Sequence, residues 1–286
     1  VQFWDMTERQ VIMTLSLDDT AAHSLIYSQD AKTLATGSYR KIKVWSISTD
    51  EQISCMNVEL QHCLTSHSHI VSCLALGKNG TILVSGSKDK TIKIWHLKTG
   101  ELLRTLKGHK DGVNTVAISQ DEQIIASGSA DKTIKLWDIE GKLIWTFQGH
   151  INDIYSIDFS TDGKKLASGS MDNTVKIWQV EDGKLINTLK NHISGIWKVL
   201  FSPDGKKIAS ASWDNTIKLW NTNGILLETL KGHNGRVRGI AWSPNGKTIA
   251  STSEDKTIRF WNLDNALVKT LHGHKNGIIK VAISSD

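Results

Sequence analysis

The stretch ASGSADKTIKLW at residues 126–137 decides the fold. It has the pattern of a strand, a tight turn around Asp131, and a second strand that ends in Trp137. The same pattern returns at residues 84–95, 167–178, 209–220 and 250–261, and in altered form at 35–45. One supersecondary unit is therefore repeated along the chain.

Two ladders of residues keep the repeat in register. The tryptophans at the strand ends follow one another at steps of 41 or 42 residues, with one step of 50, and a histidine ladder also has steps of 41 or 42. In five units the histidine precedes its tryptophan by 28 residues. The tryptophans are Trp4, Trp45, Trp95, Trp137, Trp178, Trp220 and Trp261, and the histidines are His67, His109, His150, His192, His233 and His274.

This pattern of Gly-His, 28 residues and then Trp, at a period near 41, resembles the WD-repeat family of β-propellers. Two units end in the dipeptide itself, Trp4-Asp5 and Trp137-Asp138. The resemblance covers essentially the whole chain and is greatest to the long multi-repeat WD proteins of bacteria. It implies an all-β propeller with four antiparallel strands in each blade, and the chain length at a period near 41 predicts seven blades.

The two ends of the chain align with complementary parts of one unit. Val1 aligns with Ile134 in a third strand, and Asp286 aligns with Asp121 just after a first strand. We therefore expect one blade to be shared by the termini and to lack its second strand. Residues 1–286 are expected to form a single propeller domain that is a fragment of a longer chain. A surplus of eight or nine residues within 46–66 predicts a surface-loop insertion.

Composition narrows the class of partner. The net charge of +5 comes largely from lysines that recur once in each unit, so no basic cluster points to nucleic acid. No apolar run approaches the roughly 20 residues that span a bilayer, and the start carries no signal peptide. Three cysteines are too few for a disulfide scaffold. We expect a cytoplasmic protein that binds neither nucleic acid nor membrane.

Serine, histidine and aspartate recur together, which suggests a hydrolase. Five identical active sites in one chain would be unusual, however. In the family that the sequence resembles, this group is a buried hydrogen-bond network: Asp orients His, His bonds Ser, and Ser meets the indole N–H of Trp. The predicted network residues are His67, Ser85, Asp89, Trp95, His109, Ser127, Asp131, Trp137, His150, Ser168, Asp172, Trp178, His192, Ser210, Asp214, Trp220, His233, Ser251, Asp255 and Trp261.

The unit that ends at Trp45 departs from this pattern. It has Asp18 in place of the histidine, Thr36 in place of the serine, and no aspartate in its turn. We expect it to be the least rigid complete blade.

Cysteines and histidines near the insertion raise the alternative of a zinc site. Cys55, His62 and Cys63 lie close to His67, His69 and Cys73, but their spacing contains no CxxC or HxxxH pair. A surface loop with incidental thiols is the better interpretation. No metal and no cofactor are therefore expected.

The most informative positions are those where the repeats differ. Trp197 and Trp213 replace smaller or polar residues of the other units, and in WD-repeat proteins such positions lie on the top face around the channel, where partners commonly dock. Trp, Tyr and Arg are enriched at binding hot spots. The alternative is that these rings only pack over neighbouring blades. The candidate partner-binding residues are Tyr155, Met171, Trp197, Trp213, Arg236 and Arg238.

The sequence thus predicts a non-catalytic interaction scaffold or sensor, not an enzyme, that binds a protein or peptide on its top face. From the resemblance alone, we also expect an effector domain upstream. One alternative is an adaptor of a ubiquitin-ligase-type assembly that reads a modified peptide through Arg236, Arg238 and Trp197. A second is an enzyme with a cofactor in the channel, which would need unique inward-facing ligands that the sequence does not show.

Overall fold

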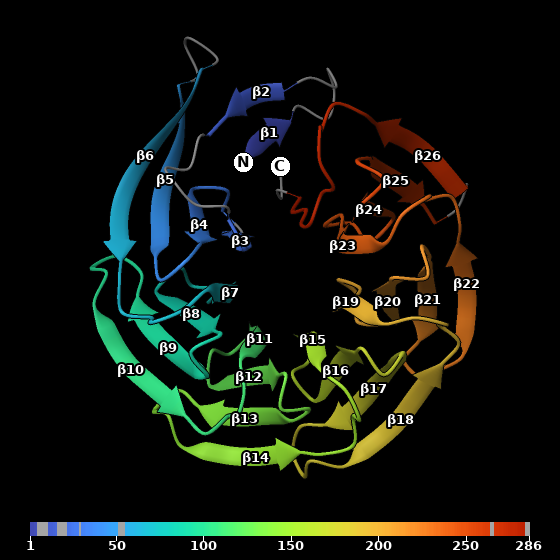
Figure 1. The fold of residues 1–286 in the computed structure, drawn as a ribbon, viewed down its shortest axis with the longest axis horizontal. Helices are drawn as coiled ribbons and strands as arrows, with labels where there is room; N and C mark the ends of the chain where they lie inside the picture. The colour runs from blue at the N-terminus through green and yellow to red at the C-terminus, as the bar shows by residue number, and fades with distance from the viewer. Residues whose placement is uncertain (5–10, 16–21, 29, 51–54, 264–265, 284–286) are drawn as a thin grey trace.

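The structure is a computed structural model that describes the chain except for residues 5–10, 16–21, 29, 51–54, 264–265 and 284–286. Its strands form small antiparallel sheets that stand around a central axis (Figure 1). In each four-stranded sheet the first strand lies nearest the axis and the fourth lies outside. Among the described residues, no helix is long and apolar enough to cross a membrane.

Six sheets of four strands, called blades 1 to 6 in chain order, make up most of the ring. Blade 1 contains β3 (Ser24–Tyr27), β4 (Thr33–Gly37), β5 (Ile42–Asp50) and β6 (Cys55–Leu64), and blade 2 contains β7 (Val71–Leu76), β8 (Ile82–Ser87), β9 (Thr91–His96) and β10 (Leu102–Lys107). Blade 3 contains β11 (Val113–Ile118), β12 (Ile124–Ser129), β13 (Ile134–Asp138) and β14 (Leu143–Phe147), and blade 4 contains β15 (Ile154–Phe159), β16 (Lys165–Ser170), β17 (Thr174–Gln179) and β18 (Leu185–Lys190). Blade 5 contains β19 (Ile196–Phe201), β20 (Lys207–Ser212), β21 (Ile217–Asn221) and β22 (Leu226–Leu230), and blade 6 contains β23 (Val237–Trp242), β24 (Thr248–Ser253), β25 (Ile258–Asn262) and β26 (Ala266–Leu271).

The prediction of seven four-stranded blades, one of them shared by the termini, is wrong. The structure has six such sheets, whereas β1 (Gln2–Trp4) and β2 (Val11–Thr14) pair only with each other. The described residues after His274 form no strand. The physical reason is the absent second strand. Paired strands lie about 4.8 Å apart, and no described strand lies between β1 and residues 278–283 to link them.

The tight turn between the second and third strands follows from a Ser-x-Asp-x-Thr pattern. In blade 3 the Ser129 hydroxyl accepts a hydrogen bond from the backbone N–H of Asp131, whose carboxylate accepts one from the N–H of Thr133. Between them Lys132 has a φ of 69°, in the left-handed region. The equivalent residues Lys90, Asn173, Asn215 and Lys256 have φ between 68° and 71°. One turn geometry is therefore reproduced in blades 2 to 6.

The hydrophobic core is divided into clusters that lie between neighbouring blades. Between blades 3 and 4, Leu136 and Phe147 of one blade pack with Ile154 and Trp178 of the other. Residues 278–283 likewise pack against blade 6 through apolar side chains, although they form no strand. A four-stranded sheet is too small to bury both faces alone, so each blade completes the core of its neighbours.

The surplus residues within 46–66 do not form the surface loop that was predicted. They lengthen β5 and β6, which pair from Ile42 and Leu64 out to Asp50 and Cys55. Within the extension Ser48 pairs with Asn57. Strand pairing satisfies the backbone polar groups that a loop would leave to water, and residues 51–54 lie outside the described part of the chain.

Candidate functional site

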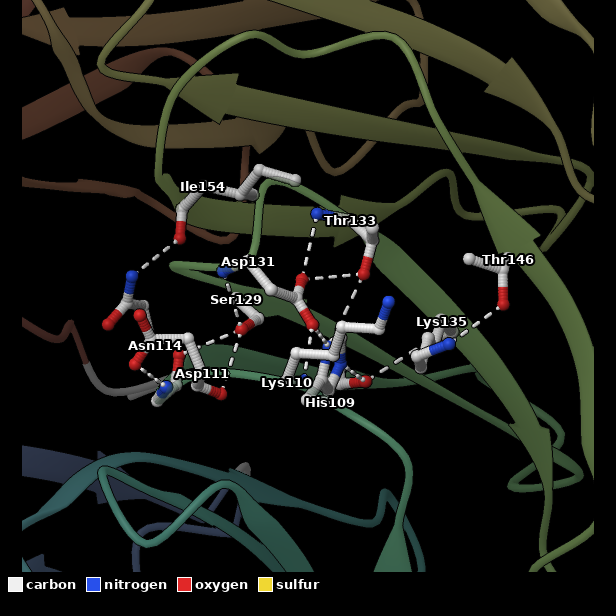
Figure 2. A network of polar contacts seen from close by, with 12 residues as sticks. His109, Lys110, Asp111, Asn114, Ser129, Asp131, Thr133, Lys135, Thr146 and Ile154 are labelled. Carbon is white, nitrogen blue, oxygen red and sulfur yellow. Dashed lines mark hydrogen bonds and ion pairs between the residues drawn. The ribbon is translucent and has the colours of Figure 1, made fainter.

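A buried polar network lies in each of blades 2 to 6, and Figure 2 shows part of the network in blade 3. Nδ1 of His109 lies 2.9 Å from Oδ2 of Asp131, and its Nε2 lies 2.8 Å from Oγ of Ser127. The indole N–H of Trp137 donates to the same Ser127 oxygen at 3.0 Å. The hydroxyl of Thr133 donates to Asp131. These bonds hold the imidazole ring in one orientation.

The other four blades repeat this geometry. The His–Ser distances are 2.7 to 2.8 Å, the His–Asp distances 2.6 to 2.8 Å and the Trp–Ser distances 2.8 to 2.9 Å. All five serines are 0% exposed. A serine hydroxyl that is bonded on both sides and closed to solvent offers no nucleophile to a substrate. The arrangement therefore supports a structural role.

Electrostatics in the network follow from burial and hydrogen bonding. Burial raises the pKa of Asp172, but the hydrogen bond and charge of His150 and the hydrogen bond of Thr174 outweigh it and hold the pKa well below its usual value. Burial lowers the pKa of His150, against the opposing effect of Asp172. At neutral pH the network of blade 4 thus contains a carboxylate that accepts a hydrogen bond from a neutral imidazole.

Blade 1 retains only part of the network. The indole N–H of Trp45 donates to the hydroxyl of Thr36 at 3.3 Å, longer than the equivalent contact in the other blades. Asp18, which replaces the histidine in sequence, lies outside the described residues. The expectation that this blade is the least rigid remains a prediction.

A second feature lies on one rim of the ring, which we call the top face. It consists of the turns between second and third strands together with the loops that begin at the network histidines. In blade 5 the two parts are joined by a hydrogen bond from the N–H of Trp213 to the carbonyl of Gly195, at 3.0 Å. In blade 4 the N–H of Met171 donates to the carbonyl of Asp153 in the same way.

Three aromatic rings form a column across blades 4 and 5. The rings of Tyr155 and Trp197 have centroids 4.3 Å apart at an interplanar angle of 23°, and those of Trp197 and Trp213 are 5.4 Å apart at 18°. All three side chains are partly exposed. The indole nitrogen of Trp213 is buried without a hydrogen-bond partner among the described residues. The column therefore combines stacking with an uncompensated polar atom, which carries a stability penalty.

Two guanidinium groups from blade 6 complete the column. Cζ of Arg236 lies 4.1 Å from the ring centroid of Trp213, and Cζ of Arg238 lies 4.4 Å from that of Trp197. Nε of Arg238 donates to the Glu254 carboxylate at 2.9 Å, and its Nη2 also donates to it. Nε of Arg236 is 3.9 Å from the same carboxylate. Cation–π contacts thus hold both arginines against the rings.

The structure brings together all six residues that were predicted as partner-binding. Met171 joins the group through the loop of blade 5, because a Cβ atom at Gly195 would lie 2.1 Å from the Met171 sulfur. Sequence reasoning missed two exposed isoleucines on the same face, Ile151 at 77% and Ile193 at 85%. Their backbone N–H groups donate to the network carboxylates of blades 4 and 5. A comparison with Lys110 in the same slot of blade 3 could have revealed them.

The cysteine and histidine residues of the suggested zinc site do not come together. His62 bonds the carbonyl of Lys98 at 3.0 Å, while Cys63 is exposed and Cys73 is buried in the cluster between blades 2 and 3. The side chain of Cys55 lies outside those that the structure describes. Within the described residues, no group of three His, Cys, Asp or Glu is placed to bind a metal.

Comparison with known proteins gives a family match over five segments. The model described as "WD domain, G-beta repeat" matches residues 58–96, 100–138, 141–179, 183–221 and 224–262. Each segment contains the outer strand of one blade and the three inner strands of the next. The match therefore follows the chain repeat across blades 1 to 6.

Curated relatives match shorter parts of the chain. Mitochondrial division protein 1 of Kluyveromyces lactis is 31% identical over 37% of this chain and 16% of its own length. WD repeat and SOCS box-containing protein 1 of Homo sapiens is 34% identical over 29% of this chain and 19% of its own. Nuclear distribution protein nudF of Emericella nidulans is 53% identical over 16% and 10%. The chain thus spans under a fifth of each relative, and these eukaryotic proteins give no support to a bacterial affinity.

Proposed function

The chain belongs to the WD-domain, G-beta repeat family, and from this premise we propose that it is a non-catalytic scaffold whose top face binds a protein or peptide. The binding surface is the column of Tyr155, Trp197 and Trp213 with the two arginines that cover it. Such residues supply large contact areas at little entropic cost and are the commonest binding hot spots.

One observation carries the proposal: the fold does not need the aromatic column. In blade 3 the slot of Tyr155 and Trp197 holds Asn114, which is buried and donates a hydrogen bond to the carbonyl of Ile154 at 3.1 Å (Figure 2). Its side-chain oxygen accepts a hydrogen bond from Lys88 at 2.6 Å. That slot is therefore satisfied by an ordinary polar residue. Partly exposed rings in blades 4 and 5 point to an intermolecular role.

The alternative of an adaptor that reads a modified peptide is less well supported. A phosphate group is best recognised by several basic groups with free N–H donors. Here Arg238 donates to Glu254, so only Arg236 of the pair presents a guanidinium without a hydrogen bond among the described residues. This geometry favours a single carboxylate over a phosphate.

The wider setting of the protein belongs to the same proposal. A cytoplasmic location, a single domain over residues 1–286 and an effector domain upstream rest on sequence patterns and on the resemblance described above. The scaffold role itself does not depend on them.

Capture from a lysate of the source organism, followed by quantitative mass spectrometry, tests the scaffold role. The full chain is compared with Trp197→Ala/Trp213→Ala and with Trp145→Ala, which removes a tryptophan 41% exposed on β14, away from the top face. We expect proteins that are lost from the double variant and retained by Trp145→Ala, since removal of a hot-spot residue costs about 2 kcal/mol or more. Identical protein lists from three baits with equal melting temperatures would overturn the proposal.

A further inference from the structure

Arg236 presents a guanidinium group that packs on Trp213 and makes no hydrogen bond to a described residue. Its plane is fixed by contact with Trp213, and 47% of the side chain is exposed. Its only ion-pair partner among the described residues is Glu254, whose carboxylate lies 3.9 Å from Nε, and no described residue accepts a hydrogen bond from the guanidinium. A stacked arginine with free N–H groups is pre-organised to bind a carboxylate through two parallel hydrogen bonds.

The neighbouring arginine, Arg238, already binds a carboxylate. Arg238 donates two hydrogen bonds to Glu254, and only 20% of its side chain is exposed. One carboxylate therefore serves two guanidinium groups. A single positive charge remains uncompensated at this end of the column, and it lies on the more exposed residue, Arg236.

The rest of the surface carries exposed apolar side chains and has asparagine where other blades have lysine. Ile151, Met171 and Ile193 follow one another across blades 4 and 5, linked through the contact of Met171 with Gly195. The turn positions that hold Lys90, Lys132 and Lys256 elsewhere hold Asn173 and Asn215 here. A surface without exposed cations between the two isoleucines suits aliphatic side chains of a partner.

The Tyr155 end of the column feels charges of both signs. Burial and then the charge of Asp153 raise the pKa of Tyr155, and the charge of Arg238 lowers it. The exposed guanidinium that makes no hydrogen bond to a described residue lies at the other end, on Arg236.

We propose that Arg236 is the carboxylate-binding residue of this surface, and that the partner is a peptide segment with aliphatic side chains and one nearby Asp or Glu. The aliphatic side chains cover Ile151, Met171 and Ile193, and the carboxylate pairs with Arg236. This inference rests on the proposed scaffold function and specifies the chemistry of its partner.

Selection from a library of random 12-residue peptides displayed on phage tests the inference with a defined probe. The immobilised full chain is the target, and the enriched peptides are synthesised and titrated by fluorescence anisotropy. We expect enrichment of Asp or Glu near Ile, Leu or Val. Arg236→Gln should weaken binding about 10- to 100-fold, the value of a charge-assisted hydrogen-bonded pair, and Arg236→Lys should weaken it less.

A double-mutant cycle separates direct contact from a structural effect. Replacing the peptide acid by its amide should lose as much affinity as Arg236→Gln, and the two changes together should lose little more. Ile151→Ser/Ile193→Ser should also weaken binding, whereas Lys110→Ser in blade 3 should not. Melting temperatures establish that each variant is folded.

The outcomes distinguish the inference from the function on which it rests. Peptides that require Trp197 and Trp213 but show no acidic preference, or an additive cycle, would overturn the role of Arg236 and leave the scaffold standing. Selected peptides whose binding is indifferent to both tryptophans, or a selection that enriches nothing, would count against both.

Discussion

Blades 3 and 5 have the same interior and different top faces. Their networks agree to within 0.3 Å in the His–Asp distance and 0.1 Å in the Trp–Ser distance. On the top face, blade 3 has Lys110, Asn114, Ala130 and Lys132 in the slots where blade 5 has Ile193, Trp197, Trp213 and Asn215. Because the same buried network is compatible with both sets of residues, it does not determine either set. The top-face residues can therefore vary independently of the network and reflect the function of the protein.

The largest expected effect comes from breaking the shared interior. Trp137→Ala and Trp178→Ala each remove a 2% exposed ring from the core between blades, and we expect each to reduce the free energy of unfolding by about 3–5 kcal/mol. Trp178→Ala should cost slightly more, because Phe147 stacks on that ring at 5.3 Å. Chemical denaturation measures both. Costs that differ several-fold would show that the frames are not equivalent.

Protonation of the buried network at acidic pH should reduce its contribution to the free energy of unfolding, whereas the top-face residues should not contribute to this effect. The pKa values of His150 and Asp172 are lower in the folded protein than their ordinary values of 6.5 and 3.8. These two groups therefore bind more protons in the unfolded chain, and their contribution to stability falls as the pH drops below about 6.5 for His150 and below about 4 for Asp172. Buried Asp158, whose pKa is raised to about 6, contributes in the opposite direction between about pH 6 and 4. Denaturation across this range measures the slope. Asp172→Asn should reduce the slope of the lower part, to which the equivalent aspartates of the other blades also contribute, and an unchanged slope would contradict the assignment.

Transferring the top face of blade 3 onto blade 5 sharpens the comparison directly. The triple variant Ile193→Lys/Trp197→Asn/Trp213→Ala should lose partner binding while its free energy of unfolding changes by no more than about 2 kcal/mol, since it affects partly exposed side chains. Fluorescence anisotropy with a selected peptide and thermal melting supply the two measurements. Lys110→Ile in blade 3 is the matched control. A triple variant that retained full affinity would contradict the proposal that this surface binds the partner.

The smallest effect concerns the turn residue. Lys132 and Asn173 share a left-handed φ of 69° and 68°, and asparagine tolerates this region better than lysine. Lys132→Asn should stabilise the protein by about 0.5 kcal/mol and Asn173→Lys should destabilise it by a similar amount. Melting curves of the two variants test the symmetry. Shifts of the same sign would mean that local contacts outweigh the backbone preference.

The repeating part of the fold could be predicted because its signals are local. The spacing of His109, Asp131 and Trp137 places a first strand, a tight turn and a third strand within one unit. The number of four-stranded sheets could not be predicted in this way, because it depends on pairing between distant segments near the two ends. The extension of β5 and β6 was missed because a surplus of residues between Trp45 and His67 does not by itself show whether they form a loop or longer strands.

Only part of the candidate site could be predicted from the sequence. Internal alignment of the repeats singled out Trp197 and Trp213, because the same slot is small or polar in other units. It did not single out Ile193, since an isolated isoleucine is normally buried and the slot was not compared with Lys110 of blade 3, which marks it as exposed. Stacking angles and the sharing of Glu254 by two arginines depend on side-chain rotamers, which spacing does not determine.

The apolar clusters between blades have a consequence for the order in which the chain folds. Within a blade the strands are joined by short turns, whereas contacts between blades join residues about 40 positions apart, as in the hydrogen bonds between Ser156 and Val199. Contacts run from each blade to its neighbours, so stability is approximately a sum of terms for single blades and for interfaces between adjacent blades. A nucleus of two adjacent blades can then grow by adding one hairpin pair at a time, and each step closes a loop of similar, moderate length.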